Sequence, residues 1–306
     1  MQKIKKKKLT VDDLPTELLE SIFFIVLSFG WAANQTFASA LLVNKRWHDV
    51  ARRLHLTRIS LRTERQAKLT IDHILLERQR GTFAQLAPTR NLTVDALWNQ
   101  PVPKLHELLQ LVGQTVATLT IRGNRLSCVL PDPTKLFTAT PEPIVSPIGS
   151  LPKLTHLEAS HINSFDVLTL LRASSLSLIT LKLYGSGIVL VPELASRMQP
   201  LSLPALRELT IRDVESEWEN SRSILCKAAP GLEMLSFCIR PDQFHPATEW
   251  LRAVELMALG NISLSVKVDQ AEQMESLKEE MQAAQSLAEQ RGWTLKILVD
   301  AGANSR

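Results

Sequence analysis

The sequence predicts an α/β fold in which an all-helical N-terminal segment is followed by parallel strands that alternate with helices. Two observations lead to this prediction. Amphipathic helical patterns occupy residues 11–60, and from residue 92 onward a short strand-like phrase returns, with helix-like segments between its copies. A strand and a helix in each unit place parallel strands on one side and helices on the outer side.

The first helix is expected to begin near Pro15, because proline suits the first turn of a helix and Asp12 or Asp13 can cap its free amides. A second helical pattern spans about residues 36–54, and Asn34 or Thr36 is its expected cap. The apolar positions of the first helix recur at three- and four-residue steps: Leu18, Leu19, Ile22, Phe23 and Val26. Two short helices this apolar predict a small bundle with a protein partner.

These two blocks resemble the F-box family. The first block supplies Leu14, Pro15, Glu17, Leu18, Leu19, Ile22 and Phe23. The second supplies Leu42, Val43, Lys45, Arg46, Trp47, Ala51 and Leu54. The chain departs from the family pattern at Asn44, where many members have cysteine, and residues 28–35 lack the usual acidic residue before the second block.

The resemblance implies that residues 11–60 bind the Skp-type adaptor of a cullin-RING ubiquitin ligase of the SCF type. The chain would then be a non-catalytic subunit that receives a client protein for ubiquitin-dependent degradation. The alternative is a repeat protein that acts as a scaffold and uses the helices of residues 11–60 to join a non-degradative complex. The residues expected to divide between the adaptor interface and the motif's own core are Leu14, Pro15, Leu18, Leu19, Ile22, Phe23, Leu42, Val43 and Trp47.

The repeated phrase consists of an apolar residue, two variable residues, a leucine, one variable residue and an apolar residue. Its central leucines are Leu92, Leu119, Leu157, Leu181, Leu209 and Leu235, at spacings of 27, 38, 24, 28 and 26 residues. Most of these spacings fall in the window of roughly 20 to 29 residues that leucine-rich repeats occupy. Because the asparagine expected after the strand is present only as Asn124, the region resembles a degenerate leucine-rich-repeat solenoid of the kind found behind fungal-type F-boxes.

The expected domains are a basic tail at residues 1–10, the F-box-like domain at 11–60, a linker helix within 61–90 and the solenoid at 91–300. Helix-like segments between the phrases are expected at residues 104–112, 166–173, 193–199, 220–229 and 248–259. A strand at 262–268, a helix at about 270–290 and a strand at 293–299 are expected to cap the solenoid, with Asp269 and Glu272 as a capping box and Gly292 as the helix C-cap.

The longest repeat step holds a proline-rich insertion at residues 131–150. Proline at this density continues neither a strand nor a helix, so the segment is expected to be an inserted exposed loop. Its two interpretations are a docking segment and a spacer.

The open face of the predicted sheet is the expected client-binding surface, because side chains between the core leucines point away from the core. The candidate client-binding residues are Arg122, His156, Glu158, Lys182, Tyr184, Glu208 and Arg212. Tyrosine and arginine often dominate binding energy, and a basic cluster suits an acidic or phosphorylated segment. The alternative is an ordinary solvated sheet face.

The lysine run and the three cysteines indicate the cellular compartment and exclude some kinds of site. The net charge is +4, and a run at Lys3 and residues 5–8 is a nuclear-localisation signal, a nucleic-acid-binding arm or a solvated tail. Cys128, Cys226 and Cys238 lie too far apart for a disulfide framework or a zinc site, and they indicate buried thiols in a reducing compartment.

No catalytic, metal or cofactor motif stands above background, so we expect no enzyme activity and no cofactor. We expect a cytoplasmic or nuclear protein, or one present in both compartments, and neither a membrane nor a nucleic acid as its partner.

Overall fold

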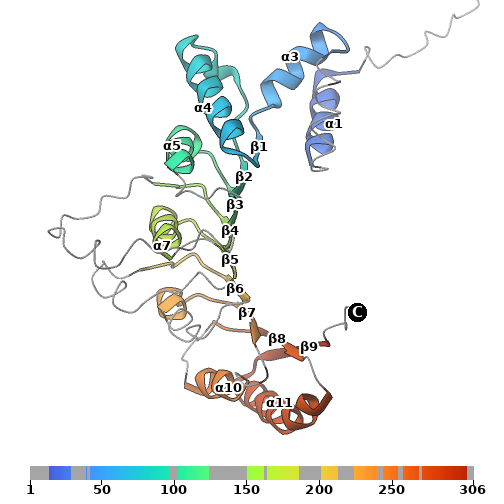
Figure 1. Cartoon of the computed structure of the whole chain (residues 1–306), viewed down its shortest axis with the longest axis vertical. Coiled ribbons are helices and arrows are strands. Elements are labelled where there is room, and N and C mark those ends of the chain that lie inside the picture. The colour runs from blue at the N-terminus through green and yellow to red at the C-terminus, as the bar shows by residue number, and fades with distance from the viewer. Residues whose placement is uncertain are drawn as a thin grey trace, which may run out of the picture. The chain divides into compact units, whose positions relative to one another are not determined.

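The architecture comes from a computed structural model of the whole chain (Figure 1). The structure describes residues 14–28, 39, 42–96, 103–123, 150–161, 164–185, 201–212, 224–239, 241, 244–253, 258–268 and 271–301. The chain divides into two compact units. Unit 1 combines Met1–Ile59 with Asp72–Asn91, and unit 2 combines Ser60–Ile71 with Leu92–Arg306.

Unit 1 contains a pair of packed helices, α1 (Thr16–Ser28) and α3 (Lys45–Leu54). The amide of Leu19 donates to the carbonyl of Pro15, which places the start of α1 where the sequence predicted it. The rings of Phe23 and Trp47 meet edge to face, with their centroids 5.5 Å apart. The core between the helices is formed by Leu19, Phe23, Val50 and Ala51, with Trp47 and Leu54 packed against it.

The start of α3 corrects the second helix prediction. The pattern at residues 36–54 predicted one continuous helix, but Asn44 has an extended backbone and its side chain accepts a hydrogen bond from the amide of Trp47 at 2.9 Å. An asparagine that caps in this way begins a helix and cannot lie inside one. Leu42 and Val43 therefore lie in the turn that precedes α3. The caps expected at Asn34 and Thr36 lie outside the described residues.

Helix α4 (Glu64–Gln79) is the helix predicted between residues 63 and 81. It ends at Gly81, whose φ of +68° is the left-handed conformation that glycine adopts readily. The amide of Thr82 then donates to the carbonyl of Glu77 at 3.0 Å. A short 3-10 helix, η2 (Phe83–Gln85), follows and leads the chain toward the sheet.

A nine-stranded sheet has its strands in chain order from β1 to β9. All the pairings from β3 to β9 are parallel, as the sequence predicted. The strands are β1 (Arg58–Leu61), β2 (Asn91–Ala96), β3 (Thr118–Gly123), β4 (His156–Ser160), β5 (Thr180–Tyr184), β6 (Glu208–Arg212), β7 (Met234–Ile239), β8 (Asn261–Val268) and β9 (Thr294–Ala301).

The leucines that define the repeated phrase stack across the sheet. Leu119, Leu157, Leu181, Leu209 and Leu235 are register partners on consecutive strands, and the row continues to Ile262 and Leu295. From Leu119 to Ile262 every member of this row is buried. Because side chains alternate between the faces of a strand, one face of the sheet carries this core and the other is open.

Helices follow strands in unit 2 as the sequence predicted. They include α5 (Pro103–Val112), α7 (Ser164–Ala173), α10 (Phe244–Ala253) and α11 (Ala271–Arg291), and α5 and α7 lie on the same side of the strands (Figure 1). Residues 224–228, within the helix predicted at 220–229, are helical as well. Helix α10 begins earlier than the predicted residue 248, because Phe244 is buried and belongs to its first turn. Gly292, with a φ of +70°, ends α11 as predicted.

Several predicted features lie outside the described residues. They are the lysine run, most of the proline-rich insertion at 131–150, the helix at 193–199, Asn124, Cys128 and the capping residue Asp269.

Candidate protein-interaction sites

The nine residues predicted to form either the adaptor interface or the motif's own core differ in their burial. Leu19 and Phe23 are buried in the α1–α3 core, and Trp47 packs against it. Four others are exposed large apolar side chains: Leu18 (52%), Ile22 (41%), Leu42 (87%) and Val43 (56%). Leu14 is half-buried and Pro15 is exposed. The surface of unit 1 therefore keeps a substantial apolar area in contact with water.

Ile25 belongs to the exposed set, and the sequence reasoning missed it. It follows Leu18 and Ile22 at helical steps of four and three residues, so the three share one stripe of α1. The signal was present in the sequence. The helix is apolar on more than one side, so the three- and four-residue steps alone do not separate Ile25 from its neighbours.

Polar contacts hold α1 and α3 together around this surface. Nη2 of Arg46 donates to the carbonyl of Leu14 and, at 3.1 Å, to Oγ1 of Thr16. Nη2 of Arg53 lies 2.9 Å from Oε1 of Glu20. Both arginines belong to α3, and their three partners are Leu14, just before α1, and Thr16 and Glu20 in its first half. The N-terminal end of α1 is thus fixed by charge-assisted hydrogen bonds, which exceed neutral ones in strength.

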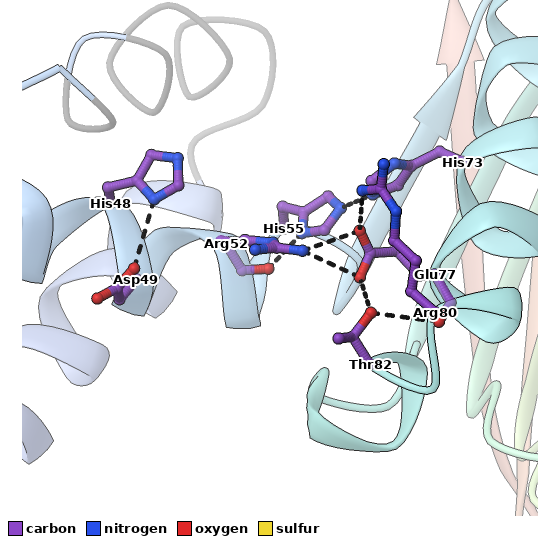
Figure 2. Close-up of polar contacts among 8 residues, drawn as sticks. All are labelled: His48, Asp49, Arg52, His55, His73, Glu77, Arg80 and Thr82. Atoms are coloured by element: carbon purple, nitrogen blue, oxygen red, sulfur yellow. Dashed lines mark hydrogen bonds and ion pairs between the residues drawn. The ribbon is translucent and has the colours of Figure 1, made fainter.

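A polar cluster in unit 1 joins α3 to the end of α4 (Figure 2). Its centre is the carboxylate of Glu77, whose side chain is 2% exposed. Nη2 of Arg52 lies 3.0 Å from Oε1 and 3.2 Å from Oε2 of Glu77, and Oγ1 of Thr82 donates to Oε2 at 2.5 Å. The hydrogen bond from Thr82, followed by the contacts with Arg52, lowers the pKa of Glu77 against the opposing effect of burial.

Two imidazoles complete this cluster. Nε2 of His55 lies 2.8 Å from Nε2 of His73, and Nδ1 of His55 contacts the carbonyl of Arg52. A carbonyl only accepts, so Nδ1 of His55 carries a proton, and in the neutral ring Nε2 must accept from His73. Burial is the main reason that the pKa of His55 is lowered, and the hydrogen bond to Arg52 opposes this effect.

The sequence does not predict this cluster, because its members are separated by up to 30 positions along the chain and no motif joins them. His48 and Asp49, also drawn in Figure 2, are exposed on α3 with Nδ1 and Oδ1 3.5 Å apart. Exposed pairs of this kind contribute little to stability.

The seven candidate client-binding residues lie in three register rows on the open face of the sheet in unit 2. The row at the carboxyl ends of the strands is Arg122, Ser160, Tyr184 and Arg212. The middle row is Thr120, Glu158, Lys182 and Thr210. The row at the amino ends is Thr118, His156, Thr180 and Glu208.

Exposure and charge differ between these rows. Arg122, Arg212 and His156 are exposed, whereas the other four candidates are partly buried. Glu208 accepts a hydrogen bond from Oγ1 of Thr180 at 3.3 Å. Glu158 and Lys182 are register partners, so their opposite charges lie side by side. The carboxyl-end row alone has cations and hydroxyl groups without a carboxylate.

In the described ranges, no three or more histidine, cysteine, aspartate or glutamate side chains are grouped so that they could hold a metal ion. Cys226 is buried and Cys238 is half-buried, and neither forms a disulfide bond within the described residues. Among the helices of the described ranges, none is long and apolar enough to cross a bilayer.

Comparison of the chain with models of protein families finds no match, and comparison with curated proteins finds none either.

Proposed function

We propose that this chain is the substrate-recognition adaptor of a cullin-RING ubiquitin ligase of the SCF type. The α1–α3 pair binds the Skp-type adaptor, the open sheet face of unit 2 binds a client protein, and the chain itself is not catalytic. The observation that carries the proposal is the exposure of large apolar side chains on α1 and on the turn before α3, beside the core that Leu19, Phe23, Val50 and Ala51 form.

Helix α1 presents two apolar stripes with different roles. Leu19 and Phe23 form the stripe that packs on α3, whereas Leu18 and Ile22 remain exposed. Burying one leucine or isoleucine side chain contributes roughly 1.5–3 kcal/mol, so a partner that covers these residues gains several kilocalories per mole. Small helical elements bind their partners in this way, by inserting a few large apolar anchors into a groove. The pattern of exposed residues fits the positions that the F-box resemblance indicates.

A repeated backbone contact supports a leucine-rich-repeat-like solenoid as the second part of the proposal. The amide of Leu151 donates to the carbonyl of Ala173, and that of Leu154 to the carbonyl of Leu151. The amides of Leu203 and Leu206 make the equivalent bonds, to Ala228 and Leu203. Both pairs of leucines are buried and precede a strand by the same number of residues. The same local geometry before β4 and again before β6 is typical of stacked repeats.

The interface is tested by substituting exposed residues, because Leu19 lies in the core and a charge there would unfold the helix pair. The double variant Leu18→Glu with Ile22→Glu is expected to lose binding to a Skp-type adaptor in a pull-down with purified proteins, since an unpaired charge cannot be buried in a groove. The matched control is Leu176→Glu, which changes an 82% exposed leucine in unit 2 and should bind normally. Full binding by the double variant would overturn the proposed interface.

The client role is tested in cells. Proteins captured by the chain should accumulate when the proteasome is blocked, and the Leu18→Glu, Ile22→Glu variant should stabilise them without the inhibitor. Captured proteins whose levels respond to neither treatment would instead favour the non-degradative scaffold.

A further inference from the structure

We propose that β9 pairs, edge to edge and antiparallel, with β9 of a second copy of this chain. β9 is the last strand in the order of the sheet, so among the described residues it has a neighbouring strand, β8, on one side only. An outer edge of this kind offers backbone amides and carbonyls to another strand. The pairing goes beyond the proposed function and involves no residue of α1 or α3.

The apolar core of unit 2 reaches the surface at β9. Three consecutive core-facing residues of β8 are buried, and they are Ile262, Leu264 and Val266. Their register partners on β9 are less covered, since Leu295 and Ile297 are half-buried and Val299 is 36% exposed. Leu298, on the opposite face of the strand, is 43% exposed. A terminal repeat that stays unpaired needs a polar outer face, so this apolar strand gains from a partner that covers it.

β9 also lacks most of the features that keep sheet edges from pairing. It is eight residues long, it contains no proline, and it pairs with β8 at eight consecutive positions without a bulge. Proteins usually protect an edge with a short strand, a proline, a bulge or a charged side chain. Of these four, β9 has only charged residues, and their positions decide which partner fits.

The backbone of β9 fixes which residues face the outer edge. The amide of Thr294 donates to the carbonyl of Gly260 at 2.8 Å, so the backbone at Thr294 faces β8. Because these groups alternate along a strand, the amides and carbonyls of Ile297 and Val299 face outward. A twofold axis through Leu298 sets Ile297 of each copy opposite Val299 of the other. Both pairs then exchange two backbone hydrogen bonds, as facing residues of an antiparallel ladder do.

The charges on β9 select this register and favour a second copy as the partner. Lys296 is exposed, and a twofold axis through it would set two lysines opposite each other. An axis through Ile297 would set Lys296 opposite Leu298. With the axis through Leu298, Lys296 lies opposite position 300 of the second copy, which is an aspartate. Opposite charges at facing positions stabilise an antiparallel pair and like charges destabilise it, so two copies of β9 complement each other twice.

The test measures the mass of the full chain by sedimentation velocity over a series of concentrations. The parent chain is expected to form a dimer that dissociates on dilution. Lys296→Asp and Asp300→Lys should each weaken this dimer about tenfold, because each turns both lysine–aspartate pairs into like-charged pairs. The matched control is Lys153→Asp, the same charge reversal at an exposed lysine in the turn before β4, and it should dimerise like the parent. Circular dichroism verifies that each variant is folded.

An equal mixture of the two β9 variants distinguishes a lost contact from a misfolded chain. In the mixture one copy has aspartate at both positions and the other has lysine at both, so a mixed pair regains two pairs of opposite charge. The mixture should therefore dimerise about as tightly as the parent, although each variant alone does not.

Three outcomes would overturn the proposal. A chain that stays monomeric at its highest soluble concentration would show that β9 does not pair with a second copy. Self-association that both charge variants leave unchanged would place the contact elsewhere on the molecule. A mixture that associates no more tightly than the separate variants would exclude the antiparallel register about Leu298. The adaptor pull-down is independent of all three results.

Discussion

Nη2 of Arg52 lies 3.0 Å and 3.2 Å from the two carboxylate oxygens of Glu77, so one guanidinium nitrogen from α3 contacts both oxygens of a buried carboxylate from α4. A buried carboxylate is costly unless it is paired and hydrogen-bonded, and Glu77 has both Arg52 and Thr82 as partners. The pairing fixes the end of α3, whose first turn follows the exposed Leu42 and Val43. We therefore expect the Arg52–Glu77 pairing to help hold α3 in place for the proposed adaptor interface.

The first prediction concerns this pair. Glu77→Gln should lower the free energy of unfolding of unit 1 by about 1–3 kcal/mol, because it removes charge-assisted hydrogen bonds from a buried site. Hydrogen exchange of the α3 amides in the full chain measures the effect. The control is Glu233→Gln, whose carboxylate is exposed and lies 3.3 Å from Arg207. An exposed pair contributes at most about 1 kcal/mol. Equal effects of the two substitutions would contradict the account of Glu77.

The second prediction concerns pH. Burial lowers the pKa of His55 below its ordinary value, so the neutral ring stabilises the fold above about pH 6.5 and this contribution is lost as the pH falls below that value. The pKa of Glu77 is also lowered, so its contribution is present above about pH 4.3 and is lost on further acidification. Unfolding of unit 1 by urea should therefore become easier from pH 7.5 to 5.5, and again below pH 4.3.

Variants separate the groups responsible for this pH dependence. His55→Gln should flatten the change between pH 7.5 and 5.5, whereas His48→Gln, on the exposed side of α3, should leave it unaltered. Stability that rises on acidification through this range would contradict the assigned role of the His55–His73 contact.

The third prediction compares adjacent leucines of α1. Leu19→Ala should destabilise unit 1 by about 2–5 kcal/mol, because it opens a cavity among Phe23, Val50 and Ala51. Leu18→Ala should change stability by less than about 0.5 kcal/mol, because its side chain is largely in water. Urea unfolding followed by hydrogen exchange measures both. Similar losses from the two variants would show that Leu18 is also a core residue.

The fourth prediction concerns the start of α3. Asn44→Ala should cost about 1 kcal/mol, because the amide of Trp47 loses its acceptor. Asn44→Asp should retain most of the stability, since aspartate caps equally well. The urea midpoint of unit 1 decides between these expectations, and an alanine variant as stable as the parent would mean that the cap is dispensable.

The fifth prediction concerns the carboxyl edge of the sheet. Gly185→Ala should destabilise unit 2 by about 1–3 kcal/mol, because the φ of +95° is unfavourable for alanine and its Cβ would meet the ring of His161. Gly260→Ala is the control, since no atom lies within 4 Å of a Cβ built there. The control should be neutral or slightly stabilising. Calorimetric unfolding of the two variants distinguishes the cases, and equal melting temperatures would contradict the strained edge.

The strands of unit 2 could be predicted from the sequence because the leucine phrase fixes both the type and the register of each strand. Leu119, Leu157 and Leu181 are register partners as their common position in the phrase requires. Strand β1 was not predicted, since its four residues Arg58–Leu61 are too few to establish an alternating pattern. The division of Leu18 from Leu19 was equally beyond the sequence, because both are leucines on an apolar helix and only packing against Val50 and Ala51 distinguishes them.

The polar cluster of unit 1 shows the limit of local patterns. Arg52 lies on α3, His55 in the turn just after it, and His73 and Glu77 on α4; within each segment alone they look like ordinary solvated side chains. Only the packing of α3 near the end of α4 brings the arginine and the carboxylate together, and no periodicity in the sequence encodes that distance. By contrast, the N-cap of α3 at Asn44 could have been predicted from the sequence, because asparagine is a preferred N-cap residue.

The in-register stacking of the leucine row from β3 to β9 has a consequence for the length of the protein. Each strand adds one apolar residue to the same row at the same register, so the core repeats from strand to strand along the sheet. Removing the 28 residues from Leu181 to the residue before Leu209 would set Leu157 beside Leu209, a leucine against a leucine as before. The sheet from β3 to β9 can thus be shortened or extended by whole repeats while its interior stays continuous, and the number of strands sets its length.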